Sequence, residues 1–531
     1  MTRQSFVYGA AVLVAASLYN RVLGFIYQIL IIDLIGANGI GLFNMVYPIY
    51  VLAIVIATLG IPLAVSKYVA EEMAHNNPRG AYRILKVSLV FLCVSGALVT
   101  LLLHLGTPLI MKYIFANPKV LYIFKVLIPG VFVVSVCSAF RGYFQGLMQM
   151  KPTALSQMLE QTARVILGLI VATILLPRGV EYAAIGASLG ILAGEIAGLF
   201  TMIAIFLHKK QDTRGTIAAP VAWREYPKIL RELCEMSIPV TLSRLIATII
   251  LSLEASLIPK RLQVAGYTLD QATTIYGQLT GMAITVLVLP SVLTSSLATT
   301  LVPAISEAAA RNNHRALRSR IIEAIRLTLL AGLPSFFTFI ILPRQITDLL
   351  FHSPEAGDLL QVLSVGGVFY YLQQTTTGIL QGLGQAQIPL RNLFVASVLE
   401  LVGLYYMTGL PELGITGAAW AVSISFIVVA SMNLWYILPY TGWSLNTNHI
   451  FFKPLFSSIL MTIVMYYSYK FGFRWSHSNA VATLSSLTLS GLTYVFTLIA
   501  TRAISPVDVE RIPYFGENLS ARLRRLFQWW N

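Results

Sequence analysis

Apolar residues fill most of the chain in long segments that are separated by turn residues or by charges. A helix needs roughly 20 apolar residues to cross about 30 Å of hydrocarbon, and segments of this length recur fourteen times. The first continues from Phe6 past Arg21 to Ile32, which predicts an uncleaved span rather than a signal peptide. The pattern predicts an all-α polytopic membrane protein with spans near 6–33, 42–66, 84–111, 122–148, 152–177, 183–207, 236–258, 274–302, 321–346, 359–383, 388–411, 416–438, 452–472 and 479–501.

The composition supports this class and excludes two others. Only 11% of the residues are charged and 56% are hydrophobic, whereas a soluble globular chain carries about 25% charged residues. The 3 cysteines lie far apart in or beside apolar runs, which excludes a disulfide-rich secreted scaffold.

The basic residues predict the orientation. If the N-terminus is cytoplasmic, the even-numbered connections and both tails hold most of the 37 lysines and arginines, as the positive-inside rule requires. Lys112, Lys119 and Lys125 run against the rule. We therefore expect a multi-pass protein of the cytoplasmic membrane with both termini inside. The net charge of +15 then reflects contact with anionic membrane lipids and requires no nucleic acid.

An internal repeat with an offset of 236 residues divides the chain. The run from Gly142 to Gln149 recurs as Gly378 to Gln385. Ile61-Pro62 and Val302-Pro303 each lead into a stretch of small residues, and a looser match pairs Asn20-Arg21 with Ser243-Arg244. The repeat predicts two parallel six-helix lobes. In transporters, lobes of this kind rock against each other around a substrate. The expected domains are an N-terminal lobe at 1–215, a C-terminal lobe at 216–442, an additional helix pair at 443–502 and a cytoplasmic tail with an amphipathic helix at 503–531.

Small residues in the repeat indicate helix packing. Gly142 and Gly146, like Gly378 and Gly382, are four residues apart, and we interpret both pairs as close helix contacts rather than as binding motifs. A glycine ladder in the sixth span indicates a further close approach, at Gly186, Gly190, Gly194 and Gly198.

Ionisable side chains inside predicted spans are the candidate functional residues, because such groups are costly in lipid unless they face a cavity or a partner. Arg21 and Arg244 occupy related helices of the two lobes. A guanidinium binds phosphate oxygens in a bidentate manner, so the two predict a site for a pyrophosphate. The alternative is that each pairs with a carboxylate or with helix carbonyls.

The fifth and sixth spans hold a second group. Glu160 and Arg164 are four residues apart on one helix face, so they are candidates for substrate binding or, alternatively, form a structural intrahelical ion pair. Gln157 and Gln161 give the same region hydrogen-bonding groups for sugar hydroxyls. Glu195 is either a coupling-ion site or the counter-ion of Arg164 or Arg21. Two further carboxylates are candidates for the coupling ion, Glu254 and Glu400.

The sequence lacks the signatures of several enzyme classes. It contains no Gly-x4-Gly-Lys-Ser/Thr loop for ATP, no His-Glu-x-x-His and no paired cysteines with metal-ligand spacing. The predicted outer connections are short, which argues against a membrane glycosyltransferase. We therefore expect no enzyme, no cofactor and no metal.

The fourth and fifth spans carry a resemblance to a known family. Ala139-Phe140-Arg141-Gly142-Tyr143-Phe144-Gln145-Gly146 and the stretch from Pro152 to Val165 resemble the polysaccharide-export branch of the multidrug/oligosaccharidyl-lipid/polysaccharide exporter superfamily. The resemblance covers all fourteen spans. It implies a flippase that moves a polyprenyl-pyrophosphate-linked saccharide, with peptidoglycan precursors for spore cortex synthesis as candidate cargo. It also implies that the last two helices border a groove for the lipid tail.

The first predicted span shows one further match to this superfamily and one departure from it. Asn20-Arg21-Val22-Leu23-Gly24-Phe25 is similar to a run in the lipid II flippases of the superfamily. Those flippases continue with a second arginine and an acidic residue, where this chain has Tyr27 and Gln28. We therefore expect a less basic cavity than in those flippases, and the sequence does not identify the headgroup that binds there.

Two other functions remain in view. A cation-coupled multidrug exporter would need an apolar cavity with an essential carboxylate and would tolerate loss of Arg21. A non-transporting scaffold that recruits cell-wall synthesis enzymes would instead depend on cytoplasmic loops such as Lys209–Arg231.

Overall fold

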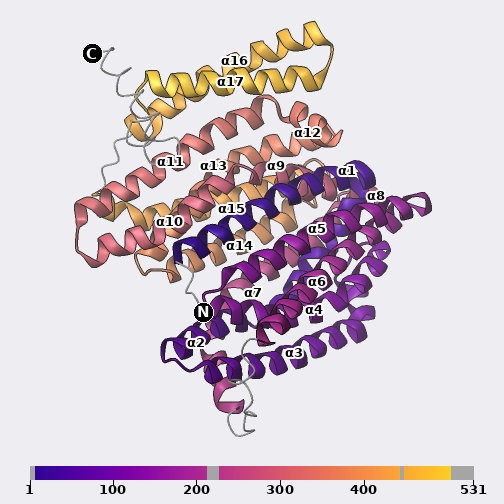
Figure 1. The fold of residues 1–531 in the computed structure, drawn as a ribbon. Helices are drawn as coiled ribbons and strands as arrows, with labels where there is room; N and C mark the ends of the chain where they lie inside the picture. The colour runs from indigo at the N-terminus through magenta and orange to yellow at the C-terminus, as the bar shows by residue number, and fades with distance from the viewer. Residues whose placement is uncertain (1–5, 212–225, 443–447, 504–531) are drawn as a thin grey trace. The chain divides into compact units, whose positions relative to one another are not determined.

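The computed structural model describes residues 6–211, 226–442 and 448–503, and every regular element in these ranges is a helix (Figure 1). The predicted amphipathic helix in the tail lies outside them. Many apolar side chains remain exposed on the described helices, for example along α3 (Pro78–Tyr113) at Leu98, Leu101, Leu102, Leu105 and Leu109. An apolar outer surface of this kind is what a lipid environment requires.

The first two predicted spans belong to one long helical segment with two breaks. Helix α1 (Phe6–Thr58) is kinked at Gly36, whose φ of 66° only glycine adopts readily. Gly60, with φ 65°, then separates α1 from α2 (Ile61–Ala74). The predicted span 42–66 therefore contains a helix break, because the left-handed backbone at Gly60 ends α1. A similar break bends the segments Leu269–Val288 and Ser291–Ala298 by 59°.

The number of helices in the described part of the chain that length and composition identify as membrane spans is smaller than the fourteen predicted. Within the described ranges, ten helices are long and apolar enough to cross a membrane, or eleven with the bent pair. Helices α1 and α2 count once in this total, although two spans were expected there. Neither α7 (Tyr226–Val264) nor α13 (Glu355–Gly382) is among the ten. Fourteen crossings therefore remain a prediction, whereas an all-helical membrane fold is confirmed.

The chain forms two compact units. Unit 1 comprises residues 1–281 and 404–414, and unit 2 comprises 282–403 and 415–531. Within unit 1, Arg261 at the end of α7 contacts the short segment 404–414, since its guanidinium lies over the Tyr405 ring, 4.1 Å from the ring centroid. The lobe boundaries expected from the repeat are not tested by these units and remain a prediction.

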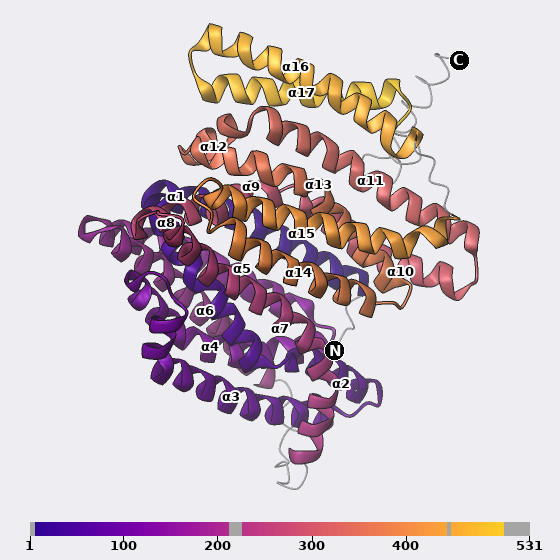
Figure 2. The same ribbon diagram turned by 180° about the vertical axis from the view of Figure 1, so that it is seen from behind.

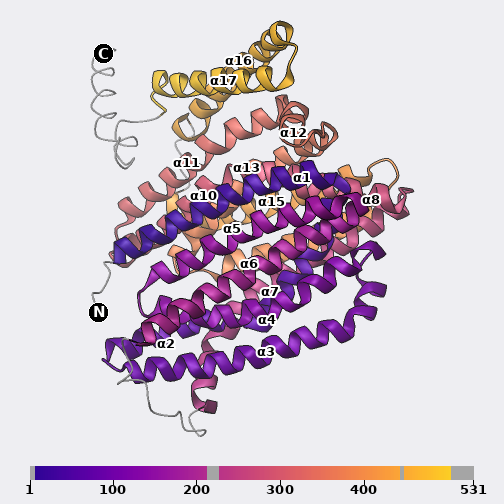
Figure 3. The same ribbon diagram turned by 45° about the vertical axis from the view of Figure 1, so that its right-hand side comes forward.

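Unit 1 is built around tight glycine contacts. Helices α4 (Leu121–Gly146), α5 (Met150–Leu175) and α6 (Val180–Gln211) pack side by side (Figure 3). A Cβ added at Gly190 of α6 would lie 2.3 Å from the Cα of Gly168 on α5. The glycine ladder is therefore a packing surface, as the sequence predicted. Helix α8 (Leu269–Gly277) packs on α1.

The repeat is visible in equivalent contacts of the two units. Gly142 and Gly146 of α4 approach the backbone of Pro62 and Ser66 in α2. In unit 2, the repeat-related glycines of α13 approach α10 (Ser291–Ala310) at Ala298 and Val302. Both predicted glycine pairs are thus confirmed as helix contacts. The contacts pair Pro62 with Ala298 at the offset of the main repeat, whereas the similar Ile-Pro and Val-Pro segments at Pro62 and Pro303 are not at this offset.

Unit 2 continues with α11 (His314–Ile341), the short α12 (Pro343–Phe351), α14 (Gln387–Met407) and α15 (Gly414–Ile437). The additional hairpin consists of α16 (Lys453–Ser476) and α17 (Asn479–Ala500), which run side by side (Figure 2). Tyr494 donates to the carbonyl of Leu330 at 2.8 Å, and Asn479 donates to Asp348 at 2.6 Å. These bonds fix the hairpin to α11 and α12.

Candidate functional site

A cluster of four charged side chains connects α4, α5 and α6 in unit 1. Arg141 Nη2 lies 2.6 Å from Glu160 Oε2, and Arg164 Nη2 lies 2.9 Å from Glu160 Oε1. Arg164 Nη2 also lies 3.1 Å from Glu195 Oε1. The charges alternate along this chain of contacts, so the cluster is neutral as a whole.

Burial makes these ion pairs consequential. The four side chains are only 10% to 20% exposed. A charge taken out of water carries a desolvation penalty of several kcal/mol, which only good geometry and additional hydrogen bonds offset. Ser156 adds such bonds, since its hydroxyl accepts from Arg141 at 3.1 Å and donates to the Gly198 carbonyl at 3.0 Å.

The glycine ladder determines where the cluster forms. A Cβ at Gly194 would lie 2.7 Å from the Glu160 carbonyl, and one at Gly198 would lie 3.1 Å from the Glu160 carboxylate. Only a helix without side chains at these positions can come close enough for Glu195 to reach Arg164. The small residues thus provide the space, and the charged residues occupy it.

The cluster is not fully satisfied by hydrogen bonds. The Nε atoms of Arg141 and Arg164 are buried and have no hydrogen-bond partner among the described residues. Two tyrosines of α1, Tyr47 and Tyr50, interact electrostatically with Arg164 and Glu195. Helix α1 therefore borders the cluster, and two buried donors in it remain unused.

These contacts confirm two predictions and reveal one omission. The intrahelical pair of Glu160 and Arg164 is confirmed, and Glu195 is the counter-ion of Arg164. Arg141 was not among the candidates, although it lies inside the predicted span 122–148. Its distance in sequence from Glu160 hides the contact, which exists only after α4 packs on the other two helices.

The remaining candidates of unit 1 lie outside this cluster. Arg21 on α1 and Arg244 on α7 are exposed, so the predicted pyrophosphate site remains a prediction. Gln157 is half-buried on α5. The amide nitrogen of Gln161 lies close to Gly24 of α1, 3.4 Å from the position of a Cβ there.

The other two candidate carboxylates are at least partly buried. Glu254 on α7 is half-buried and interacts electrostatically with Tyr276 of α8. Glu400 on α14 is 7% exposed, in unit 2. The described residues contain no group of three or more His, Cys, Asp or Glu side chains that could hold a metal ion.

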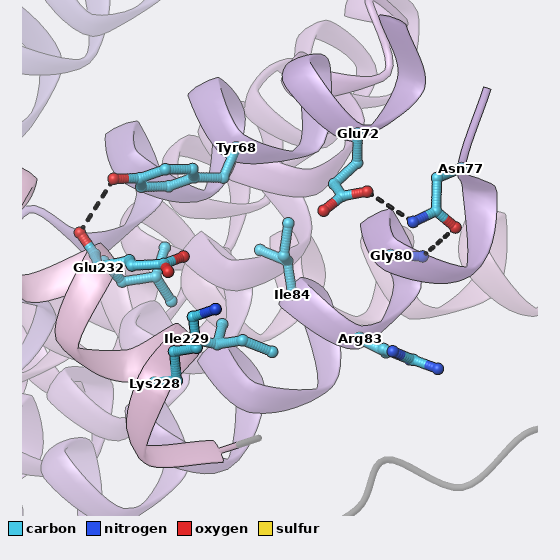
Figure 4. Close-up of a pocket in the computed structure, with 10 residues that line it drawn as sticks. Tyr68, Glu72, Asn77, Gly80, Arg83, Ile84, Lys228, Ile229 and Glu232 are labelled. Atoms are coloured by element: carbon cyan, nitrogen blue, oxygen red, sulfur yellow. Dashed lines mark hydrogen bonds between the residues drawn. The ribbon is translucent and has the colours of Figure 1, made fainter. Parts of the chain in front are cut away.

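The cavities in the described parts of the chain include the following three. One of about 430 Å³ lies between α2, α3 and α7 (Figure 4), where Asn77 donates to Glu72 at 2.7 Å and Tyr68 donates to the Glu232 carbonyl at 3.2 Å. A second, of about 480 Å³, is basic and lies along α11. The third, of about 350 Å³, is a groove between α10 and α13.

Comparison with known proteins now identifies the family. The model of the family described as polysaccharide biosynthesis protein matches residues 6–309, and the MatE family model matches residues 278–406. The chain belongs to the polysaccharide biosynthesis protein family.

Relatives of this family member extend over its whole length. Stage V sporulation protein B of Bacillus subtilis is 31% identical and covers 97% of this chain and 99% of its own. Lipid II flippase MurJ of the same organism is 24% identical, and the alignment covers 96% of this chain and 97% of MurJ. The resemblance to the exporter superfamily is therefore confirmed.

Solved structures show the same fold. A lipid II flippase MurJ in an inward closed conformation aligns with a TM-score of 0.70 at 16% identity and covers 92% of this chain and 98% of its own. An inward-facing multidrug resistance MATE family transporter of the MOP superfamily aligns with a TM-score of 0.67 at 18% identity. This alignment covers 83% of this chain and 99% of the transporter. This polysaccharide biosynthesis protein is thus a multi-pass membrane protein with a transporter fold.

Proposed function

We propose that this protein is a flippase that moves a polyprenyl-pyrophosphate-linked saccharide across the cytoplasmic membrane by alternating access. The observation that carries the proposal is the end-to-end relation to stage V sporulation protein B and to lipid II flippase MurJ. The MurJ structure covers 92% of the chain and the MATE transporter 83%. This difference favours a lipid-linked cargo over a drug, and peptidoglycan precursors for spore cortex synthesis are our candidate.

The roles of individual residues belong to the same proposal. Arg21 and Arg244 engage the pyrophosphate, because exposed guanidinium groups offer planar paired donors to phosphate oxygens. Gln157 and Gln161 hydrogen-bond the sugar. Both termini are cytoplasmic, and cell-wall synthesis enzymes are additional partners that receive the cargo. The protein performs no catalysis of its own.

The charged cluster supports an ion-coupled mechanism. Glu160 has two arginine partners, whereas Glu195 has one. Protonation of Glu195 therefore breaks one ion pair rather than two and is the less costly change. The unused Nε donors of Arg141 and Arg164 are consistent with a second arrangement of the cluster. We propose that Glu195 takes up the coupling proton, while Glu254 and Glu400 remain secondary candidates.

The test is transport in proteoliposomes that carry a fluorescent undecaprenyl-pyrophosphate-linked saccharide in the lumenal leaflet. We expect wild-type protein to move the lipid outward, and the Arg21→Ala/Arg244→Ala variant to lose this activity by tenfold or more at unchanged membrane abundance. Transport by Glu195→Gln should no longer respond to a pH gradient.

The alternatives give different results. A drug exporter would leave the saccharide lipid in place and move cationic dyes instead. A scaffold would move neither and would fail only when its cytoplasmic loops are replaced. Full activity of the double arginine variant would contradict the phosphate role.

A further inference from the structure

The groove between α10 and α13 in unit 2 has an unusual lining. Among the described residues that form it, none is charged, and the polar ones carry only amides and hydroxyls, Ser295, Gln373, Gln374, Thr377 and Gln381. Gln373, Thr377 and Gln381 are four residues apart and so share one face of α13. At about 350 Å³ it lies at the small end of the range of small-molecule sites, roughly 300 to 1,000 Å³.

One atom of the groove lacks a partner that the protein would normally supply. The Gln373 Oε1 atom is buried and accepts no hydrogen bond from the described residues. Its neighbour Gln374 differs, because its Oε1 accepts from the Thr294 hydroxyl at 2.9 Å. A buried acceptor without a donor is unfavourable, so a rotation of the partly exposed Gln373 side chain that brings this oxygen to a donating ligand in the groove would recover that energy.

The chemistry of the lining selects the ligand. A phosphate needs a cation or several backbone N–H groups, and the described residues that line this groove include no cation. A hydroxyl-rich neutral group matches it, since each amide offers one acceptor and two donors while each sugar hydroxyl both donates and accepts. The positions of the two glutamines also suit an extended ligand. Gln381 is exposed at the end of α13, and Gln373 lies about two helical turns away along the same helix.

We propose that the α10–α13 groove binds the saccharide portion of the transported lipid, with Gln373 and Gln381 as its principal contacts. This inference rests on the proposed flippase function and assigns one step of it, recognition of the uncharged headgroup. The pyrophosphate is then held elsewhere, so the two parts of the substrate are recognised by separate sets of side chains.

The experiment is native mass spectrometry of the full-length protein with two probes. These are undecaprenyl pyrophosphate and the same lipid carrying one N-acetylglucosamine. The measured quantity is the ratio of the two dissociation constants, which isolates the contribution of the sugar. We expect wild-type protein to prefer the glycosylated lipid and Gln373→Leu/Gln381→Leu to reduce that preference roughly five- to thirtyfold, because one or two hydrogen bonds contribute about 1 kcal/mol each.

A matched substitution controls for the change in polarity. Gln361 lies on the same helix outside the groove and donates to the Ile340 carbonyl at 3.2 Å, so Gln361→Leu should keep the wild-type preference. The melting temperature should not fall in the double variant, since Gln373→Leu removes an unpaired buried oxygen. An unchanged preference in that variant, or equal binding of both lipids by the wild type, overturns the saccharide site while the flippase function stands. Failure of the wild type to bind either lipid overturns the flippase function itself.

Discussion

The two units use the same repeated helices to build one polar cluster each, and the two clusters differ in charge. In unit 1, Arg141 of α4 forms a buried ion pair. In unit 2, the position 236 residues later is Thr377 of α13, whose hydroxyl accepts a hydrogen bond from Asn433 at 3.4 Å. Asn433 also accepts from Asn392 at 2.9 Å. One unit joins its three helices through charges, and the other joins them through neutral amides and hydroxyls.

The difference has a physical consequence. A buried ion pair depends on both partners, because removing one leaves a charge in a medium that cannot solvate it. A neutral hydrogen bond contributes only about 1 kcal/mol net. The charged cluster can therefore respond strongly to a proton, whereas the neutral network holds its geometry over a wide range of pH. This division suits a transporter in which one unit senses the coupling ion.

The largest effect is expected for Glu160→Leu. This change leaves two buried arginines without their shared carboxylate and should reduce the free energy of unfolding by about 3–5 kcal/mol. Thermal unfolding of the detergent-solubilised protein measures it. The double variant Arg141→Leu/Glu160→Leu restores charge balance, so it should be more stable than the single one. If the losses in the free energy of unfolding caused by Arg141→Leu and Glu160→Leu are additive in the double variant, the electrostatic explanation of the cluster is wrong.

A smaller effect is expected in the neutral network. Asn433→Ala removes a donor to Thr376 at 3.2 Å and the acceptor of Asn392. Both asparagines are fully buried, so the loss should be about 1–3 kcal/mol. The same unfolding measurement at pH 5 and pH 8 should give equal losses, because no member of the network titrates. A loss that varied with pH would show that the two units are not chemically distinct.

The sequence predicted the parts of this comparison that depend on local spacing. Glu160 and Arg164 are one helical turn apart, and the paired glycines recur at a fixed offset, so both could be assigned without coordinates. Arg141 could not, because its contact with Glu160 requires α4 and α5 to pack at one particular depth. The break at Gly60 was missed for a related reason. The apolar pattern continues through it, and only the backbone conformation ends the helix.

The smallest effect is expected for Thr377→Ala, and its comparison with Arg141→Ala at the equivalent position tests whether the repeat itself or its chemistry matters. Arg141→Ala and Thr377→Ala change equivalent positions, yet the first should cost about 3–5 kcal/mol and the second less than about 1 kcal/mol, since it removes one long hydrogen bond. Comparing the melting temperatures of the two variants separates the explanations. Equal losses would mean that both positions act through the shared helix packing around Gly142 and Gly378. Unequal losses in the predicted order would mean that the charge determines the difference, because the backbone contacts at these glycines are the same in both units.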